Sequence, residues 1–203
     1  GKRLHSMAAL QKQSLSMLPQ GRGRCTEDAP RGAVGWFRAG GTADVLFKPA
    51  DTEDLQKFMV QCPPDIPITV LGVLSNTIVR DGGVAGVVIR LGREFAQIET
   101  RSENEIYAGA AALDLNVANF AADNGIDNLS FFSGVPGSIG GAVAMNAGAY
   151  GGETKDVMPY ADFITRQGEL MRLTPSDLAM AYRYSDLPKD AIAIGAMFAG
   201  VNA

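Results

Sequence analysis

Short apolar runs separated by polar or glycine-rich stretches dominate the pattern of this chain, and such runs predict β-strands. In the segment 43–48, for example, Val45 and Phe47 stand at the spacing of two that places side chains on one face of a strand. Runs of the same kind predict strands over 43–48, 68–71, 86–91 and 191–201.

Two further segments have the pattern of antiparallel hairpins. The runs 95–100 and 106–110 flank the polar turn RSENE, and the segment 162–173 turns at Arg166-Gln167-Gly168. Apolar runs joined through a short turn that contains glycine or several polar residues favour strands that pair with each other.

Helical spacing lies between these runs. Asp51 in the N-cap position predicts a helix to about residue 61, with Asp54 in its first turn. We expect this helix to bury Leu55, Phe58 and Met59.

A second amphipathic helix is expected over 114–124, ended by Gly125 and with an apolar face made of Leu115, Ala118, Phe120 and Ala121. A short helix is expected to open at Thr174-Pro175 with Asp177 as the partner in a capping box, and 6–18 has weaker helical spacing. Because hairpins and helical crossovers are mixed, the expected fold class is α+β, with a boundary near Gly92.

Composition and charge exclude several classes of function. The formal net charge of −4 argues against a nucleic-acid or anionic-membrane binder, and no protein partner can be inferred. The only cysteines, Cys25 and Cys62, form no CxxC and favour a reducing compartment, so we expect a cytoplasmic protein. The single histidine, His5, excludes a Ser-His-Asp triad and a His-rich metal site, and no metal ligands are expected.

The glycines are concentrated where chemistry can take place. The segment 128–152 carries no formal charge, but its glycines, proline and asparagines indicate a loop and a buried helix rather than a membrane span. Glycine-rich segments at 72–83 and 134–142 favour a nucleotide cradle, in which backbone N–H groups and the hydroxyls of Ser75 and Ser138 bind a diphosphate. Ordinary turns are an equally good interpretation from composition alone. A P-loop is absent, and a Rossmann fingerprint is weak.

The chain resembles the UDP-N-acetylenolpyruvoylglucosamine reductase (MurB) family in four segments: WFRAGGTADVLFKP (36–49), LGVLSNTIVRDGGVAGVVIRLG (71–92), GVPGSIGGAVAMNAGAYGGE (134–153) and AYRYSDLP (181–188). The resemblance implies a vanillyl-alcohol-oxidase (PCMH) type of α+β fold, with FAD-binding subdomains at 1–92 and 93–203. It also implies that NADPH reduces FAD, which then reduces the enolpyruvyl group of a UDP-sugar to give UDP-N-acetylmuramate for peptidoglycan synthesis.

The resemblance carries the family's roles to matching residues. Arg183, within the motif YRYS, matches the active-site arginine, whose guanidinium can stabilise the charge that develops on the substrate carboxylate. The positions expected to bind FAD are Gly72, Val73, Leu74, Ser75, Asn76, Asp81, Gly134, Val135, Pro136, Gly137, Ser138, Gly141, Ala142, Asn146, Ala147 and Gly148.

Two departures from the family pattern qualify these expectations. Leu74 stands where the family has the second glycine of its GxGSN loop, so FAD affinity is expected to be weakened. The family's substrate-binding domain, with its serine proton donor and second carboxylate, is expected to follow Ala203, so this chain is expected to be the FAD-binding part and inactive alone. The alternatives are a FAD subunit of another oxidoreductase and a non-catalytic flavin- or nucleotide-binding module.

Overall fold

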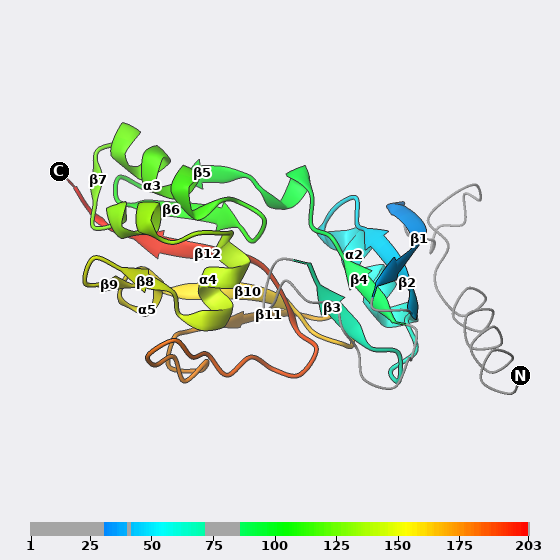
Figure 1. The fold of residues 1–203 in the computed structure, drawn as a ribbon. Helices are drawn as coiled ribbons and strands as arrows, with labels where there is room; N and C mark the ends of the chain where they lie inside the picture. The colour runs from blue at the N-terminus through cyan, green and yellow to red at the C-terminus, as the bar shows by residue number, and fades with distance from the viewer. Residues whose placement is uncertain (1–30, 40–41, 72–85, 203) are drawn as a thin grey trace, which may run out of the picture. The chain divides into compact units, whose positions relative to one another are not determined.

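The structure is a computed structural model that describes residues 31–39, 42–71 and 86–202 (Figure 1). The expected helix at 6–18, His5, Cys25 and the glycine-rich segment 72–83 lie outside the described residues. The chain divides into two compact units. Among the described residues, unit 1 holds 31–39, 42–71, 86–90 and 166–169, and unit 2 holds 91–165 and 170–202.

Unit 1 contains a four-stranded sheet in the order β1-β2-β4-β3. Its strands are β1 (Ala33–Ala39), β2 (Thr42–Lys48), β3 (Ile68–Val70) and β4 (Val87–Ile89). β1 pairs with β2 in antiparallel fashion, whereas β4 runs parallel to both β2 and β3. The expected runs at 43–48, 68–71 and 86–91 are therefore strands. β1 was not expected, because Gly35 and the following Ala-Gly-Gly weaken its strand pattern.

Helix α2 (Thr52–Gln61) packs on this sheet as its sequence predicts. The Asp51 side chain accepts a hydrogen bond from the N–H of Asp54 at 2.8 Å and caps the helix. The rings of Phe47 and Phe58 stack with centroids 4.1 Å apart, and Leu55 is fully buried beside them. The apolar spacing of α2 therefore does supply the core of unit 1.

The buried carboxylate of Asp54 joins three parts of unit 1. It accepts hydrogen bonds from the N–H of Arg31, from the N–H of Gly32 at 2.8 Å and from the N–H of Ala50 at 2.7 Å. These contacts connect the start of β1 and the segment after β2 to the first turn of α2. A carboxylate that accepts several backbone N–H groups is satisfied even when it is buried.

Unit 2 contains an antiparallel five-stranded sheet in the order β11-β10-β12-β6-β5. Its strands are β5 (Ile98–Thr100), β6 (Glu105–Gly109), β10 (Tyr160–Ile164), β11 (Leu170–Leu173) and β12 (Ile192–Ala199). Both expected hairpins and the expected last strand are present. Alternate side chains, including Ile106, Phe163 and Phe198, enter one hydrophobic core.

The core of unit 2 also includes short helices. They are α3 (Asp114–Asp123), the 3₁₀ turn η2 (Ser130–Gly134) and α4 (Ile139–Met145), and α4 lies over β12 and β6 (Figure 1). The remaining elements of unit 2 are η1 (Arg93–Phe95), β7 (Ile126–Asp127), β8 (Gly148–Ala149), β9 (Gly152–Glu153), α5 (Thr154–Val157) and β13 (Val201–Asn202). None of the helices in the described part of the chain has the length and apolarity that crossing a bilayer requires.

Two sequence-based expectations were wrong in detail. Leu115 is 49% exposed, and α3 instead buries Val117 together with Ala118 and Ala121. The segment after Thr174 forms only a turn, because Ala179 adopts a positive φ of 45° and ends it. The expected reciprocal bonds between Thr174 and Asp177 are nevertheless present, at 2.9 and 3.1 Å.

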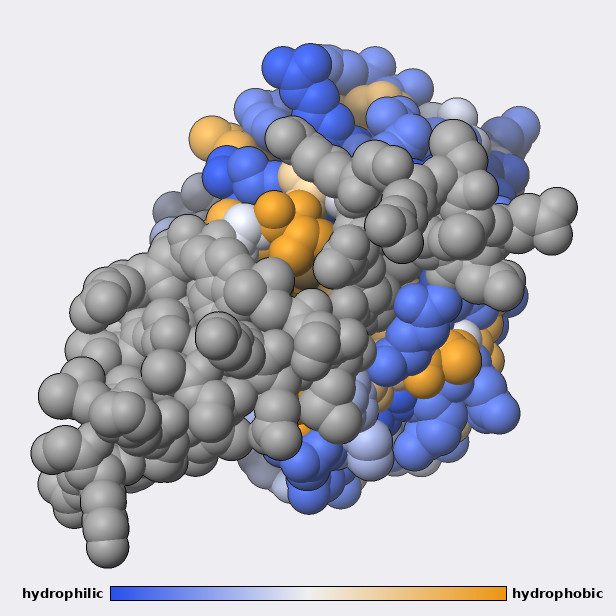
Figure 2. Space-filling model, turned by 90° about the vertical axis from the view of Figure 1, so that its right-hand side faces the viewer, coloured by the Kyte–Doolittle hydropathy of each residue, from blue (hydrophilic) through white to orange (hydrophobic). Residues whose placement is uncertain are grey.

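The surface seen in Figure 2 is mixed rather than dominated by one apolar area. Among the described residues that this view leaves visible, hydrophilic ones prevail and hydrophobic ones form small separate groups. Single exposed apolar residues are normal on folded proteins and indicate no interface by themselves.

Candidate functional site

The glycine-rich loop between η2 and α4 is held against the segment that leads into α3. The N–H of Asp114 donates to the carbonyl of Gly137 at 3.0 Å, and the N–H of Ile139 donates to the carbonyl of Ala112 at 2.9 Å. The N–H of Gly140 completes the pairing with the carbonyl of Ala110 at 2.8 Å. These three hydrogen bonds hold the loop in one position, although the loop itself has no regular secondary structure.

Two backbone donors of the loop are left over by this pairing. Within the described residues, no hydrogen bond uses the N–H of Gly137 or of Ser138. Gly137 is exposed and has a φ of +103°, a conformation in which a Cβ is strained, so glycine is required there for its backbone. Consecutive unpaired N–H groups on a fixed, exposed loop are suited to binding an anion.

The side chains of the loop face in two directions. Pro136 is exposed, whereas Val135 and Ala142 are buried in the hydrophobic core of unit 2. A Cβ on Gly134 would lie 2.5 Å from the ring of Tyr150, so glycine allows the two segments to approach closely. A ligand of this loop would therefore meet mainly backbone atoms and the Ser138 hydroxyl.

Asn146 ends α4 in the left-handed conformation, with a φ of 46°. Its side chain is 1% exposed, and both ends of its amide have partners. The Nδ2 atom donates to the carbonyl of Ala181 at 2.8 Å, and the Oδ1 atom accepts from the N–H of Lys155 at 2.9 Å. The N–H groups of Asn146 and Ala147 both donate to the carbonyl of Ala142. The expected cofactor contacts of Asn146, Ala147 and Gly148 stay predictions.

Arg183 lies in a tight turn beside the end of α4. Ala181 and Tyr184 exchange two backbone hydrogen bonds of 3.0 Å, and Arg183 between them has a φ of +52°. The side chain is exposed, and its guanidinium carbon lies 5.3 Å from the centroid of the Tyr182 ring. No hydrogen bond or ion pair within the described residues occupies the guanidinium. Arg183 is therefore available to an anionic ligand.

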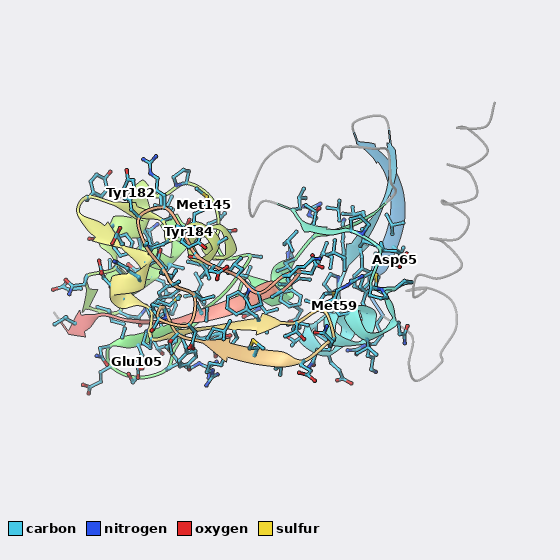
Figure 3. The ribbon with its side chains drawn as sticks, turned by 90° about the horizontal axis from the view of Figure 1, so that it is seen from below. Met59, Asp65, Glu105, Met145, Tyr182 and Tyr184 are labelled. Atoms are coloured by element: carbon cyan, nitrogen blue, oxygen red, sulfur yellow. The ribbon has the colours of Figure 1, made fainter. Side chains whose placement is uncertain are left out.

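Exposed apolar side chains accompany Arg183. Met145 is 44% exposed, Tyr182 75% and Tyr184 51%, and Figure 3 shows the three side chains in the same part of unit 2. Aromatic rings beside a free guanidinium suit a ligand that has both a planar group and a negative charge.

Asp114, which the sequence marks only as the start of a helix, is a chemically unusual residue. Its side chain is fully buried, and neither carboxylate oxygen has a hydrogen-bond partner within the described residues. Burial raises the pKa of this carboxyl to about 8. An acidic residue in the first turn of a helix normally indicates a surface position, so no sequence signal distinguishes it.

A cavity of about 350 Å³ lies elsewhere in unit 2. It is lined by Asn128, Ser130, Phe131, Tyr150, Gly151, Gly152, Glu153, Asp156 and Val157. None of the site residues expected from the sequence lines it. Glu153 and Asp156 already cap α5 through reciprocal hydrogen bonds, so the acidic side of the cavity is used internally.

Several expected positions cannot be placed. Gly72, Val73, Leu74, Ser75, Asn76 and Asp81 lie outside the described residues, so the expected first phosphate loop stays a prediction. Cys62 is buried, and burial raises the pKa of its thiol, as is typical of an unreactive structural cysteine. The described residues contain no group of three or more His, Cys, Asp or Glu side chains arranged to hold a metal ion.

Known proteins resemble this chain over most of its length. UDP-N-acetylenolpyruvoylglucosamine reductase of Acidiphilium cryptum is 52% identical over 179 residues, covering 88% of this chain and 58% of the relative. The protein of that name from Phenylobacterium zucineum is 53% identical over 185 residues, covering 90% of this chain and 62% of the relative. The chain thus spans about 60% of the length of these relatives.

A solved structure of a protein with the same name also resembles this chain. The crystal structure of UDP-N-acetylenolpyruvylglucosamine reductase (MurB) from Thermus caldophilus matches 84% of this chain and 63% of its own, with a TM-score of 0.69 and 28% identity. The expected α+β fold of the vanillyl-alcohol-oxidase type is therefore confirmed. The family model described as "FAD binding domain" matches residues 43–174, and on this match the chain belongs to the FAD-binding domain family.

Proposed function

We propose that this chain is the FAD-binding part of an NADPH-dependent reductase that converts UDP-N-acetylglucosamine enolpyruvate to UDP-N-acetylmuramate. The observation that carries the proposal is the arrangement around α4. One end of this helix adjoins the unpaired N–H groups of Gly137 and Ser138, and the other adjoins the turn that presents Arg183. Relatives that are about half identical and bear the reductase name support it. The role in peptidoglycan synthesis and the cytoplasmic location are part of the same proposal.

The residues of the loop fit the diphosphate of FAD. Gly137 is exposed and Ser138 half-buried, and their N–H groups have no acceptor among the described residues. Hydrogen bonds to Ala112 and Asp114 hold the loop in place. Donors that are already oriented bind an anion without a further cost of ordering the loop. FAD held by these groups would serve as a redox carrier, taking up hydride from NADPH and passing hydride to the enolpyruvyl carbon of the substrate.

Arg183 supplies the positive charge that this reaction needs at the substrate. Hydride addition to the enolpyruvyl double bond develops negative charge toward the substrate carboxylate, and a guanidinium can pair with that carboxylate through two N–H groups. Since Arg183 has no anionic partner among the described residues, its charge is not already neutralised. The adjacent Tyr182 and Tyr184 offer exposed rings to the rest of the ligand.

Arg183→Gln tests this role in FAD-loaded protein expressed from the complete reading frame. We expect NADPH oxidation that depends on the enolpyruvyl substrate to fall by about 10²- to 10³-fold, as when one stabilising donor is removed from an active site. FAD affinity should change by less than about twofold. Arg93→Gln is the matched control, because Arg93 is also an exposed arginine of unit 2 and is not one of the expected site residues.

Three outcomes contradict the proposal in different ways. Absence of flavin binding would contradict the assignment of FAD as the cofactor. A flavoprotein that oxidises NADPH without any dependence on the UDP-sugar substrate is a different oxidoreductase or a binding module. Full activity in Arg183→Gln would contradict the role of the arginine but not the assignment of the FAD site.

A further inference from the structure

The turn that carries Arg183 has a backbone conformation that needs support from its surroundings. Arg183 has a φ of +52°, a region in which residues with a Cβ are uncommon. Such conformations persist where neighbouring contacts determine them, and they are concentrated at functional sites. Only two residues separate the paired Ala181 and Tyr184, so a small change at either end moves the arginine.

Two side-chain hydrogen bonds fasten this turn to the last part of α4. Asn146 donates from Nδ2 to the carbonyl of Ala181, on one side of the turn, at 2.8 Å. On the other side, Ser185 donates from Oγ to the carbonyl of Val143 at 2.6 Å. Val143 is within the last four residues of α4, whose carbonyls have no partner inside the helix. The serine therefore satisfies a helix carbonyl and anchors the turn with one bond.

The orientation of the Asn146 amide follows from its partners. Nδ2 faces a carbonyl and Oδ1 faces the N–H of Lys155, so the opposite orientation would place two donors and two acceptors against each other. Because Asn146 is 1% exposed and each end of its amide already has a protein partner, the side chain serves the protein's own structure.

We propose that Asn146 and Ser185 are positioning residues that hold the Arg183 turn to α4, so that the guanidinium keeps a constant place relative to the loop at the start of the helix. The proposal rests on the proposed function and deepens it, because both residues act on the anionic substrate through Arg183. α4 has seven residues, about 10 Å of helix, so the two groups that it connects lie within reach of one extended ligand.

The experiment uses Ser185→Ala, which removes one bond, and Ser185→Thr, which retains the hydroxyl. Protein with bound FAD, from the complete reading frame, is assayed for kcat/KM with the enolpyruvyl substrate and for the Kd of FAD. Ser185→Ala should lower kcat/KM by about threefold to tenfold, the net effect of one hydrogen bond, with the Kd of FAD unchanged within about twofold. Ser185→Thr should recover most of the loss. Ser102→Ala, an exposed serine of unit 2 far from the turn in sequence, is the control.

A double-mutant cycle separates positioning from general support of the fold. If Ser185 acts through Arg183, the variant with Ser185→Ala and Arg183→Gln together should be no slower than Arg183→Gln alone. The proposal would be overturned if the fold-losses in kcat/KM of the two single variants multiply in the double variant, because a residue that only supports the fold acts independently of the arginine. Asn146→Gly, which retains the left-handed backbone and loses both bonds, should behave in the same way, with Asn124→Gly at the end of α3 as its control.

Amide hydrogen exchange tests the attachment without relying on activity. In Ser185→Ala the N–H groups of Ala181 and Tyr184 should exchange faster, by at least about threefold, while Ile139 and Gly140 keep their protection. Unchanged exchange at Ala181 and Tyr184 would overturn the positioning role even if the protein is active. If the wild-type protein fails to reduce the substrate, the proposed function falls, and this exchange result still decides whether the attachment exists.

Discussion

At the scale of single residues, backbone conformation and burial determine the chemistry of this site more than residue type does. Gly137 is needed for its φ of +103° and not for space, because nothing lies within 4 Å of a Cβ placed there. Asp114 is distinguished only by its environment, since its carboxyl is buried and has no hydrogen-bond partner among the described residues. Both residues adjoin the same loop, and each gives a prediction.

Gly137→Ala should lower the free energy of unfolding by about 1–3 kcal/mol, because alanine is strained at positive φ. Relaxation of this strain moves the N–H groups of the loop, so FAD binding should weaken as well. Gly92→Ala is the matched control: its Cβ would also meet nothing within 4 Å, but its φ is −99°. The control should be neutral or more stable by up to about 1 kcal/mol, since alanine restricts the unfolded chain. Urea unfolding and FAD titration measure both variants, and equal behaviour of the two would contradict the argument from φ.

Asp114 should make unit 2 less stable as the pH rises. Burial raises the pKa of this carboxyl from 3.8 to about 8, so between these values the folded state binds more protons than the unfolded chain. The free energy of unfolding attributable to Asp114 therefore decreases with increasing pH across this window, and the stabilisation is lost above about pH 8.

Asp114→Asn removes this titration and should flatten the pH dependence of unfolding between about pH 5 and about pH 8. Near neutral pH and above, the variant should be more stable than the wild type, by on the order of 1–3 kcal/mol for a buried group without partners. Asp123→Asn, at the exposed end of the same helix, is the control. A wild-type slope that survives in Asp114→Asn would show that another group is responsible.

At the scale of elements, the helices of both units are attached to other segments by hydrogen bonds between side chains and backbone groups. In unit 2 the hydroxyl of Ser185 donates to a carbonyl of α4. In unit 1 the carboxylate of Asp54, in the first turn of α2, accepts from backbone N–H groups of two other segments. Short elements cannot be stable by themselves, because helix nucleation is costly and most of their stability comes from tertiary contacts. Removing such a contact should therefore loosen the whole element.

Asp54→Ala should destabilise unit 1 by about 2–4 kcal/mol, because it leaves the N–H groups of Arg31, Gly32 and Ala50 without their acceptor. Glu53→Ala is the neighbouring control, since Glu53 is largely exposed and its ion pair with Lys57 at 3.4 Å contributes little. Urea unfolding followed by circular dichroism compares the two. Similar losses in both variants would assign the effect to helix propensity rather than to the buried carboxylate.

At the scale of the whole molecule, the chain and its relatives differ in length. The chain covers 58% and 62% of the two reductases described above, and the resemblance assigns the proton donor to a part of the family that this chain does not match. A net charge of −4 is compatible with an anionic substrate only if positive charge is concentrated locally, as at Arg183.

Residues 1–203 alone, saturated with FAD, should reduce the enolpyruvyl substrate at least about 10²-fold more slowly than protein from the complete reading frame. General-acid catalysis contributes about 10²- to 10⁴-fold, and loss of substrate positioning lowers the rate further. The measurement is substrate-dependent oxidation of NADPH by the two proteins, with oxidation by oxygen subtracted. Comparable rates would mean that the proton donor lies within these residues and that the roles taken from the family are wrong.

Much of the fold follows from local patterns in the sequence. Apolar spacing predicts β2, β3, β4 and both hairpins, and the Asp51 cap predicts the start of α2, because these signals depend on residues a few positions apart. The glycine-rich motif at 134–142 and the motif around Arg183 likewise indicate the proposed site; the first lies within the residues 43–174 that the family model matches, and the roles of both stay predictions.

Tertiary structure decided which groups are buried and which partners they have. Leu115 is exposed while Asp114 beside it is buried, because the packing of α3 against η2 sets the face that is covered. Asn146 and Ser185 lie far apart in sequence, yet they fasten one turn to one helix. Hydrogen bonds across such sequence separations form only when the chain has brought both segments together, so no local pattern records them.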